Sequence, residues 1–350
     1  MSLADALVKV VEGRSLTPGE AEEAMGAILR GEASPPQIAA FLTALRMKGE
    51  TVEEIAAFAG VMRSFSVKIH PKVPGCLIDT CGTGGSPVKT FNVSTLSALT
   101  VAAAGGYVAK HGNRAVSSRC GSADLLEGFG VNIQAEPKTV ERCVERVGVG
   151  FMFAPKFHQA MKHALLPRRE IKIRTVFNIL GPLTNPAPVE AQVLGVYSLD
   201  LVEKLAAVLE KLGLEKAFVV HGLIGVDEVS LVGPTHVAEL NHGTVKSYDV
   251  HPRQFGLEEG KTVEELRGGE LKQNLRESLE VLGGVRNAKA EMTALNAAYA
   301  LLAASKVERV EEGLELAWEA LSSGKALEKL RLLIKESGGD PGKLEALEHD

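Results

Sequence analysis

The sequence has little that would place the protein in a membrane. Its longest apolar stretches, such as residues 96–104, fall short of the ~18 to 20 residues that a membrane-spanning helix requires. Its first twenty residues also lack the apolar core and the small-residue cleavage site of a secretory signal peptide. We therefore expect a soluble, cytoplasmic protein that has no membrane partner.

Cysteine and excess positive charge are also lacking. The 350 residues include four cysteines, none in C-x-x-C spacing, which argues against a disulfide scaffold or a cysteine-based metal site. Acidic residues outnumber basic ones, 44 to 39, and the formal net charge is −5. A chain of this charge has no global attraction for nucleic acid, so we expect no nucleic-acid partner and look for local clusters that bind anions.

The beginning of the chain is dominated by helical patterns. Apolar residues recur at helical spacing through the first sixty-odd residues. Three of the expected helices start with a capping box, in which Thr17, Ser34 or Thr51 is followed three residues later by Glu or Gln. We predict a small, all-helical domain over residues 1–70, to which helices around 164–186 also belong.

After residue 70 the pattern changes to short β-type runs that alternate with helical stretches. This alternation predicts an α/β fold: a large domain over residues 71–350 with a central mixed, mainly parallel sheet flanked by helices. Residues 178–190 are rich in Pro, Gly and Asn and predict an ordered loop or a crossing between domains, whereas residues 271–334 read as largely helical. The expected strands are 76–80, 107–110, 150–153, 192–197 and 217–221.

A glycine-rich turn, GTGG at residues 82–85, follows the first expected strand. Glycines let the backbone N–H groups approach a phosphate, and the helix that follows adds the partial positive charge of its N-terminus. By itself, such a turn is as typical of a plain strand-to-helix connection. The polar residues Asn92, Ser94 and Thr95 at the helix start favour a phosphate site, although each could also be a helix cap.

The basic segment KHGNRAVSS at residues 110–118 gives a stronger signal. It follows an expected strand and combines charge for phosphate, at Lys110 and Arg114, with directional donors, at His111 and Asn113. Hydroxyl groups follow at the entrance to a helix. A charge run is usually a solvated surface, but this one lies between an apolar strand and an apolar helix, which favours a binding site.

An adjacent carboxylate pair, Asp227 and Glu228, follows the expected strand 217–221. Mg²⁺ is typically held by one or two carboxylates together with water and substrate phosphates. A pair of this kind is commonplace in itself and mostly structural. Its weight comes from the two phosphate-type segments, because a bound pyrophosphate would require a metal partner.

These motifs together carry a resemblance to a known family. The series GTGG, TFNVST, VAKHGNR, SSRCGSADLLE, RTVFNILGPLTNP and DEVS, in this order and at these separations, resembles the anthranilate phosphoribosyltransferases of tryptophan biosynthesis. The match extends over most of the chain, including the helical start. It implies the fold predicted above and a pentosyltransferase that moves the phosphoribosyl group of 5-phosphoribosyl 1-pyrophosphate (PRPP) to the amine of anthranilate. It also implies a homodimer that associates through the helical domain.

The resemblance also implies roles for individual residues. It assigns Mg²⁺, two ions per subunit, to Ser94, Asp227 and Glu228. No nucleophile or base is implied; Lys110, Asn113 and His111 would stabilise the transition state and the leaving group. The residues implied in anthranilate binding are Gly82, Asn113, Arg168, His111 and Pro182. The residues implied in PRPP binding are Gly82, Gly85, Ser86, Thr90, Asn92, Val93, Ser94, Thr95, Lys110, His111, Gly112, Asn113, Arg114, Ala115, Val116, Ser117, Ser118 and Ser122.

The chain departs from the family pattern at one point. The family usually continues GTGG with Asp and Gly, whereas this chain has Ser86 and Pro87. The change removes one carboxylate from the phosphate loop, and either Ser86 donates a hydrogen bond there or the pyrophosphate is bound differently.

Two other functions are compatible with part of the pattern. A pyrimidine nucleoside phosphorylase has a similar lysine-containing phosphate segment but would need only inorganic phosphate. A non-catalytic relative that binds nucleic acid would show a basic surface and eroded metal ligands. The acidic composition and the retained Asp227 and Glu228 favour the transferase.

Overall fold

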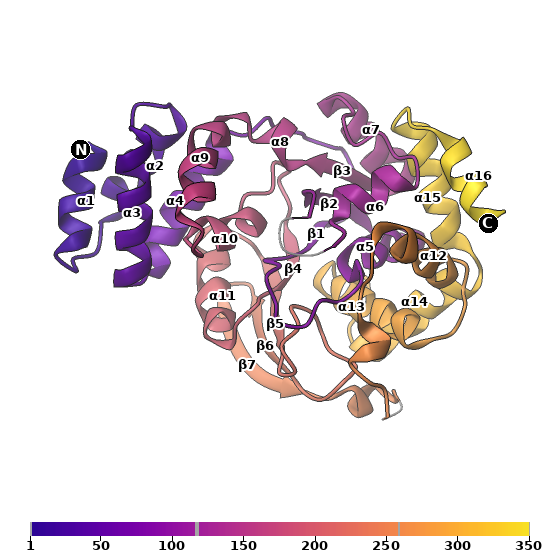
Figure 1. Cartoon of the computed structure of the whole chain (residues 1–350). Coiled ribbons are helices and arrows are strands. Elements are labelled where there is room, and N and C mark those ends of the chain that lie inside the picture. The colour runs from indigo at the N-terminus through magenta and orange to yellow at the C-terminus, as the bar shows by residue number, and fades with distance from the viewer. Residues whose placement is uncertain (1, 116–118, 258–259, 350) are drawn as a thin grey trace.

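The N-terminal part of the molecule is a group of helices that pack on one another at one end (Figure 1). The computed structural model describes residues 2–115, 119–257 and 260–349. The first helices are α1 (Leu3–Val11), α2 (Pro18–Leu29), α3 (Pro35–Lys48) and α4 (Val52–Ser64). None of the helices in these described ranges combines the length and the apolar character needed to cross a membrane.

The predicted capping residues start three of these helices. The side chains of Thr17 and Thr51 each accept a hydrogen bond from the backbone N–H three residues further on. At the start of α3, the backbone N–H of Ser34 donates to the side-chain oxygen of Gln37 at 3.0 Å. These contacts satisfy backbone groups that a helix terminus leaves without partners, so the predicted helix starts are confirmed.

The rest of the chain is built around one sheet. The described residues form seven strands in the order β3-β2-β1-β4-β5-β6-β7. The first five of these are parallel neighbours, and β6 and β7 are antiparallel. This confirms the predicted α/β class with a mixed, mainly parallel sheet. The strands are β1 (Leu77–Gly82), β2 (Tyr107–Gly112), β3 (Val149–Phe153), β4 (Ala191–Gly195), β5 (Lys216–Gly222), β6 (Thr235–Asn241) and β7 (Thr244–Val250).

Helices flank both faces of this sheet (Figure 1). The predicted helical stretch 271–334 is confirmed by α12 to α15. The α-helices are α5 (Val93–Ala103), α6 (Ser122–Gly128), α7 (Pro137–Val147), α8 (Ala154–Phe157), α9 (Lys162–Ile171), α10 (Phe177–Leu180), α11 (Val202–Lys211), α12 (Leu271–Leu282), α13 (Ala288–Ala303), α14 (Val310–Ser322), α15 (Lys325–Glu336) and α16 (Pro341–Glu348). The 3₁₀ turns are η1 (Gln159–Met161), η2 (Gly181–Leu183), η3 (Leu199–Leu201), η4 (Pro252–Phe255) and η5 (Glu264–Leu266).

The hairpin of β6 and β7 was not predicted. Its strands are joined by His242 and Gly243, which both have positive φ, 45° and 79°. Two central residues with positive φ are the hallmark of the type I′ turn that matches the twist of a hairpin. The Asn-His-Gly sequence between two alternating runs was therefore a usable signal.

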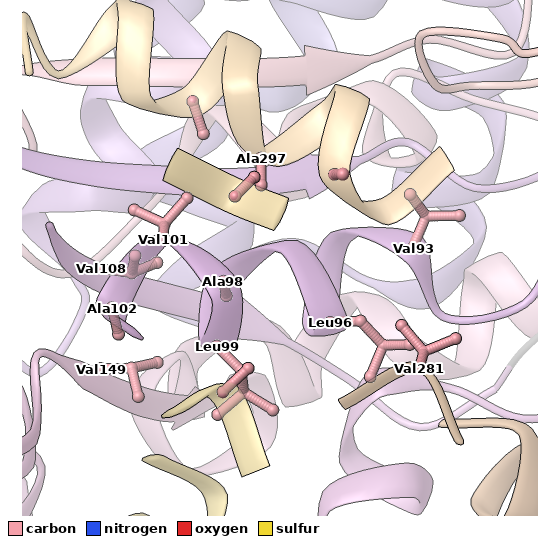
Figure 2. Close-up of a cluster of buried hydrophobic side chains, with 14 of the residues drawn as sticks. Val93, Leu96, Ala98, Leu99, Val101, Ala102, Val108, Val149, Val281 and Ala297 are labelled. Atoms are coloured by element: carbon pink, nitrogen blue, oxygen red, sulfur yellow. The ribbon is translucent and has the colours of Figure 1, made fainter. Parts of the chain in front are cut away.

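Helix α5 lies at the centre of the large domain. Figure 2 shows its apolar side chains packed between strands β2 and β3 and helices α12 and α13. Because it is covered on several sides, buried side chains lie all around its circumference, and none of its residues is charged. This packing fixes the N-terminus of α5, with Ser94 in its first turn, at one edge of the sheet.

A second hydrophobic cluster connects the helical part to the sheet. It includes Phe41 and Phe58 of the first helices, Phe177 of α10, Leu205 of α11 and Val219 of β5. Helix α9 also packs against α2 and α3. Residues 164–186 therefore lie between the two parts of the molecule, and the boundary near residue 70 stays a prediction.

Candidate functional site

The predicted phosphate and metal segments lie at one edge of the sheet. The glycine-rich turn begins at the last residue of β1, the basic segment begins in the last three residues of β2, and Asp227 and Glu228 follow β5. These strands are parallel, so their carboxyl ends lie at the same edge. That edge is the usual ligand site of an open α/β sheet.

The glycine-rich turn folds directly over Asp227. A Cβ atom added at Gly82 would lie 2.6 Å from the Asp227 carboxylate, so a side chain does not fit there without movement. Gly84 and Gly85 have φ of 63° and 81°, which side chains rarely adopt. The Gly84 N–H and the Ser86 hydroxyl donate to the two Asp227 oxygens at 2.9 and 2.6 Å. Ser86 is thus a donor that positions Asp227.

Glu228 is half-buried beside this turn. The Thr90 hydroxyl donates to its Oε1 at 2.7 Å, whereas its Oε2 is buried without a hydrogen-bond partner among the described residues. Burial, together with the neighbouring Asp227 charge, raises the pKa of Glu228 well above its ordinary value. An acceptor oxygen in this position is suited to a cation.

The three predicted metal-binding residues share one cavity. Ser94, Asp227 and Glu228 all line it, together with Thr80 and Cys81. Within the described residues, no group of three His, Cys, Asp or Glu side chains could hold a metal. A divalent cation here would therefore depend on two carboxylates and a hydroxyl, with substrate oxygens completing its ligands. These oxygen donors fit Mg²⁺.

Lys110 connects two strands to α5. Its side chain is buried, and Nζ donates to the Thr80 carbonyl at 2.6 Å and to Ser94 Oγ at 3.0 Å. Burial lowers the pKa of Lys110, and the nearby Asp79 opposes that effect. The ammonium group therefore holds the hydroxyl of a predicted metal ligand.

The other predicted residues at the start of α5 have separate environments. Asn92 donates to the Cys120 carbonyl at 3.2 Å, which connects α5 to the segment after β2. Val93 is buried in the hydrophobic core. The Thr95 hydroxyl is buried and has no hydrogen-bond partner among the described residues.

The basic segment is only partly available to an anion. Arg114 is paired with Asp124 and Glu127 at 3.0 and 2.7 Å, so its charge is directed to α6. Asn113 Oδ1 accepts from the Arg114 N–H at 2.8 Å, and the Ala115 N–H donates to Asp124 at 2.9 Å.

The rest of that segment is set by close packing. A Cβ atom at Gly112 would overlap the Ser122 hydroxyl, which itself lies 3.4 Å from the Asn113 carbonyl. Predicted residues Val116, Ser117 and Ser118 lie outside the described residues.

His111 faces a second histidine that the sequence did not identify. The ring centroids of His111 and His158 are 4.9 Å apart, and Nε2 of each ring is buried without a partner among the described residues. Burial, followed by the charge of nearby groups, lowers the pKa of His111 to about 3. Burial is also the main cause that lowers the pKa of His158 to about 4. Both rings are therefore neutral at pH 7.

The predicted anthranilate residues Arg168 and Pro182 lie on the side of the helical domain. The Arg168 guanidinium lies 4.9 Å from the centre of the Phe177 ring, and burial lowers its pKa. The adjacent Arg169 is exposed. The Pro182 carbonyl accepts a hydrogen bond from Gln192 at 2.7 Å.

Arg174 is a further cation that sequence reasoning missed. Its Nη2 donates to the Gly85 carbonyl at 2.6 Å, and its guanidinium lies 4.2 Å from the centre of the Tyr197 ring. It therefore holds the glycine-rich turn against the segment after β4. Arg174 is the first residue of the RTVFNILGPLTNP motif, and its place in that motif was the sequence signal that could have identified it.

Comparison with known proteins agrees with this geometry. Residues 75–327 match the family model for the glycosyl transferase family a/b domain, and residues 4–66 match that for its helical bundle domain. The fold and the site thus define a glycosyltransferase. The chain is also 51% identical over 342 residues to anthranilate phosphoribosyltransferase from Citrifermentans bemidjiense, with 94% of this chain and 97% of the relative covered. The chain belongs to the anthranilate phosphoribosyltransferase family.

Solved structures of similar proteins have the same fold. The anthranilate phosphoribosyltransferase of Thermus thermophilus is 42% identical with a TM-score of 0.90, covering 95% of this chain and 99% of that one. The Saccharomyces cerevisiae enzyme in complex with PRPP and Mg is 29% identical with a TM-score of 0.88, covering 96% and 98%. The yeast enzyme has also been solved in complex with 4-fluoroanthranilate.

Proposed function

We propose that this chain transfers the phosphoribosyl group of PRPP to the amine of anthranilate and releases pyrophosphate, the second step of the tryptophan branch. The observation that carries this proposal is the convergence of Ser94, Lys110, Asp227 and Glu228 at one edge of the sheet. Family membership supports the same reaction, and the yeast relative binds PRPP with Mg.

Mg²⁺ would be held by Ser94, Asp227 and Glu228, and we propose two ions per subunit. When bound, it would neutralise charge on the pyrophosphate group. Lys110 orients Ser94 through its 3.0 Å hydrogen bond, and the glycine-rich turn orients Asp227. Because these groups are fixed before the substrate binds, little reorganisation is needed when charge develops on the leaving group.

The amine nitrogen of anthranilate bonds to C1 of the ribose as the bond from C1 to the pyrophosphate oxygen breaks, through a transition state with oxocarbenium character. The product nitrogen then loses one proton to solvent. The amine is neutral at pH 7, so the reaction demands no strong base. With a pKa of about 3, the His111 ring is not a proton acceptor suited to neutral pH, which favours a positioning role. Holding the two substrates in the correct orientation is then the larger part of catalysis.

We propose that anthranilate lies between the basic segment and residues 177–186. Gly82, Asn113, His111 and Pro182 would form its walls, and Arg168 would balance its carboxylate. A half-buried guanidinium beside an aromatic ring provides the cation and the partly apolar wall that an aromatic acid requires. The yeast relative with 4-fluoroanthranilate supports this class of ligand.

The remaining proposals concern the assembly and the compartment. We propose a homodimer that associates through the helical domain, because Val8 and Val11 of α1 are 58% and 68% exposed. Exposed apolar side chains on one helix face are typical of an interface. A biosynthetic role supports a cytoplasmic location.

Fluorescence of anthranilate tests the reaction directly. We expect its fluorescence to fall when the protein, PRPP and Mg²⁺ are present together, with one pyrophosphate released per anthranilate consumed. Omission of PRPP or addition of EDTA should abolish both signals. Phosphate-dependent cleavage of a pyrimidine nucleoside, without pyrophosphate release, would contradict the proposal.

A further inference from the structure

Two consecutive backbone carbonyls of residues 181–184 accept hydrogen bonds from side chains of two different parts of the chain. The Pro182 carbonyl accepts from Gln192 of β4 at 2.7 Å, and the Leu183 carbonyl accepts from Arg63 of α4 at 2.7 Å. We call Arg63 and Gln192 the carbonyl clamp.

Gln192 is the member of the clamp that joins this segment to the sheet. It is 1% exposed and pairs in register with Asp79 of β1. Its Nε2 also lies 3.0 Å from Cys81 Sγ and 3.4 Å from Asp79 Oδ2. Gln192 therefore connects the Pro182 carbonyl to the strand that leads into the glycine-rich turn.

Arg63 is the member that comes from the helical domain. It is half-buried, and its guanidinium also reaches the Leu212 carbonyl at the end of α11 at 3.5 Å. Its hydrogen bonds thus go to one carbonyl of residues 181–184 and to one at the end of α11. Arg63 fixes the position of residues 181–184 relative to α4.

Asn185 holds the end of the same segment. Its Nδ2 donates to the Ala109 carbonyl of β2 at 2.8 Å, and its Oδ1 accepts from the Ala187 N–H at 2.9 Å. Residues 181–185 are therefore tied to β2, β4 and α4 at once. A segment rich in Pro, Gly and Asn has few hydrogen bonds of its own, so these side chains are what define its position.

We infer that Gln192 and Arg63 are positioning residues that set the affinity for the amine acceptor by holding residues 181–184 against the phosphoribosyl-binding strands. The inference rests on the proposed function, in which Pro182 forms part of the anthranilate wall. Neither side chain needs to touch a substrate, because each acts through the backbone carbonyl that it holds. PRPP binding depends on residues other than Gln192 and Arg63.

Steady-state kinetics of Gln192→Met and Arg63→Met test this inference. Both changes keep an unbranched side chain and remove the donors. We expect KM for anthranilate to rise about tenfold, the effect of one lost hydrogen bond, while KM for PRPP changes less than about twofold. Arg63→Lys, which keeps a donor, should recover most of the affinity for anthranilate.

Ser337→Ala is the matched control for a purely structural effect. Ser337 is 5% exposed, donates to the Ile334 carbonyl at 2.9 Å and accepts from the Asn132 N–H at 3.1 Å, in the C-terminal helices. The Ser337→Ala variant should have a lower melting temperature and unchanged KM values for anthranilate and PRPP. If the Gln192 and Arg63 variants behave like this control, or raise both KM values equally, the inference is wrong. A wild-type chain that neither binds nor consumes anthranilate would overturn the proposed function and this inference with it.

Discussion

Ser86 shows how one residue can change the charge of the site and still hydrogen-bond with one of its carboxylates. It stands where the family usually has Asp, is 2% exposed, and donates to Asp227 at 2.6 Å. A hydroxyl at this position holds Asp227 by a hydrogen bond and, relative to the family pattern, removes one negative charge from the phosphate loop. Of the two interpretations that the sequence left open, the structure favours the hydrogen-bond donor.

Replacing this hydroxyl with a carboxylate should make folding depend on metal. In Ser86→Asp, two buried carboxylates would repel each other, so we expect a lower melting temperature than the wild type in EDTA. Mg²⁺ should restore it, because a ligand that binds only the folded state stabilises it. Scanning calorimetry with and without Mg²⁺ measures this. Ser86→Ala adds no charge and is the control; equal melting temperatures in EDTA for Ser86→Asp and the wild type would refute the prediction.

Arg168 is the residue whose role is most easily separated from that of its neighbour. Arg168→Ala removes the cation proposed to balance the anthranilate carboxylate, and we expect KM for anthranilate to rise at least about tenfold. Arg169→Ala, on the exposed side of the same helix, should leave KM within about twofold of the wild type. Steady-state assays at saturating PRPP compare the two. If Arg168→Ala and Arg169→Ala have equal KM values for anthranilate, Arg168 does not bind the acceptor.

At the scale of elements, the β6–β7 hairpin is joined to helix α11 by one histidine. The two ring nitrogens of His236 of β6 hydrogen-bond at 2.6 Å with Asp249 of β7 and Glu203 of α11. Burial opposes the charged ring, but the two carboxylates outweigh it and raise the pKa of His236 above 6.5. The edge of the sheet therefore gains stability from a protonated ring.

This arrangement predicts that the contribution of His236 depends on pH. Because the folded-state pKa is raised, its extra stability is present below pH 6.5 and is lost as pH rises through the higher folded-state value. We expect His236→Gln to lower the free energy of unfolding by about 1 kcal/mol at pH 6 and by less at pH 9. The loss at pH 6 is small because the carboxylates of Glu203 and Asp249 are exposed to solvent. Urea unfolding at both pH values measures the difference. An equal loss at both would show that the ring is not charged in the folded protein.

At the scale of the whole molecule, the helical part has two different surfaces. One of its faces packs against α9 and α11, next to residues 177–186. Another leaves Val8 and Val11 of α1 exposed. The helical part can therefore contribute to the acceptor site and to the proposed dimer through different surfaces.

Charge on α1 should distinguish the roles of these two surfaces. We expect Val8→Asp combined with Val11→Asp to convert the proposed dimer to a monomer, because charged side chains are poorly tolerated in the centre of an apolar interface. Light scattering coupled to size-exclusion chromatography gives the mass. Lys138→Asp, an exposed change on α7, is the control. A wild-type monomer, or a variant that stays dimeric, would contradict association through this face.

The features that were predicted correctly depend on residues close together in the chain. Thr17 and Thr51 cap helices through partners three residues away, so the sequence pattern alone was sufficient. The strands that end in GTGG and KHGNR are short β-type runs that begin with apolar residues. The β6–β7 hairpin escaped prediction although its turn had a local signal. The order of the motifs along the chain also carried the family resemblance that implied the class of reaction.

The arrangement of the site required folding, because its contacts join residues far apart in the chain. The hydrogen bond from Ser86 to Asp227 spans 141 positions, and that from Arg63 to the Leu183 carbonyl spans 120. No periodicity or spacing reports such a pair, and His158 had no motif at all. Local propensities and motifs therefore specified the helix starts, the main strands and the chemistry of each segment. The packing of the sheet and helices determined which segments meet, since parallel strands bring their carboxyl ends to one edge whatever their separation in sequence.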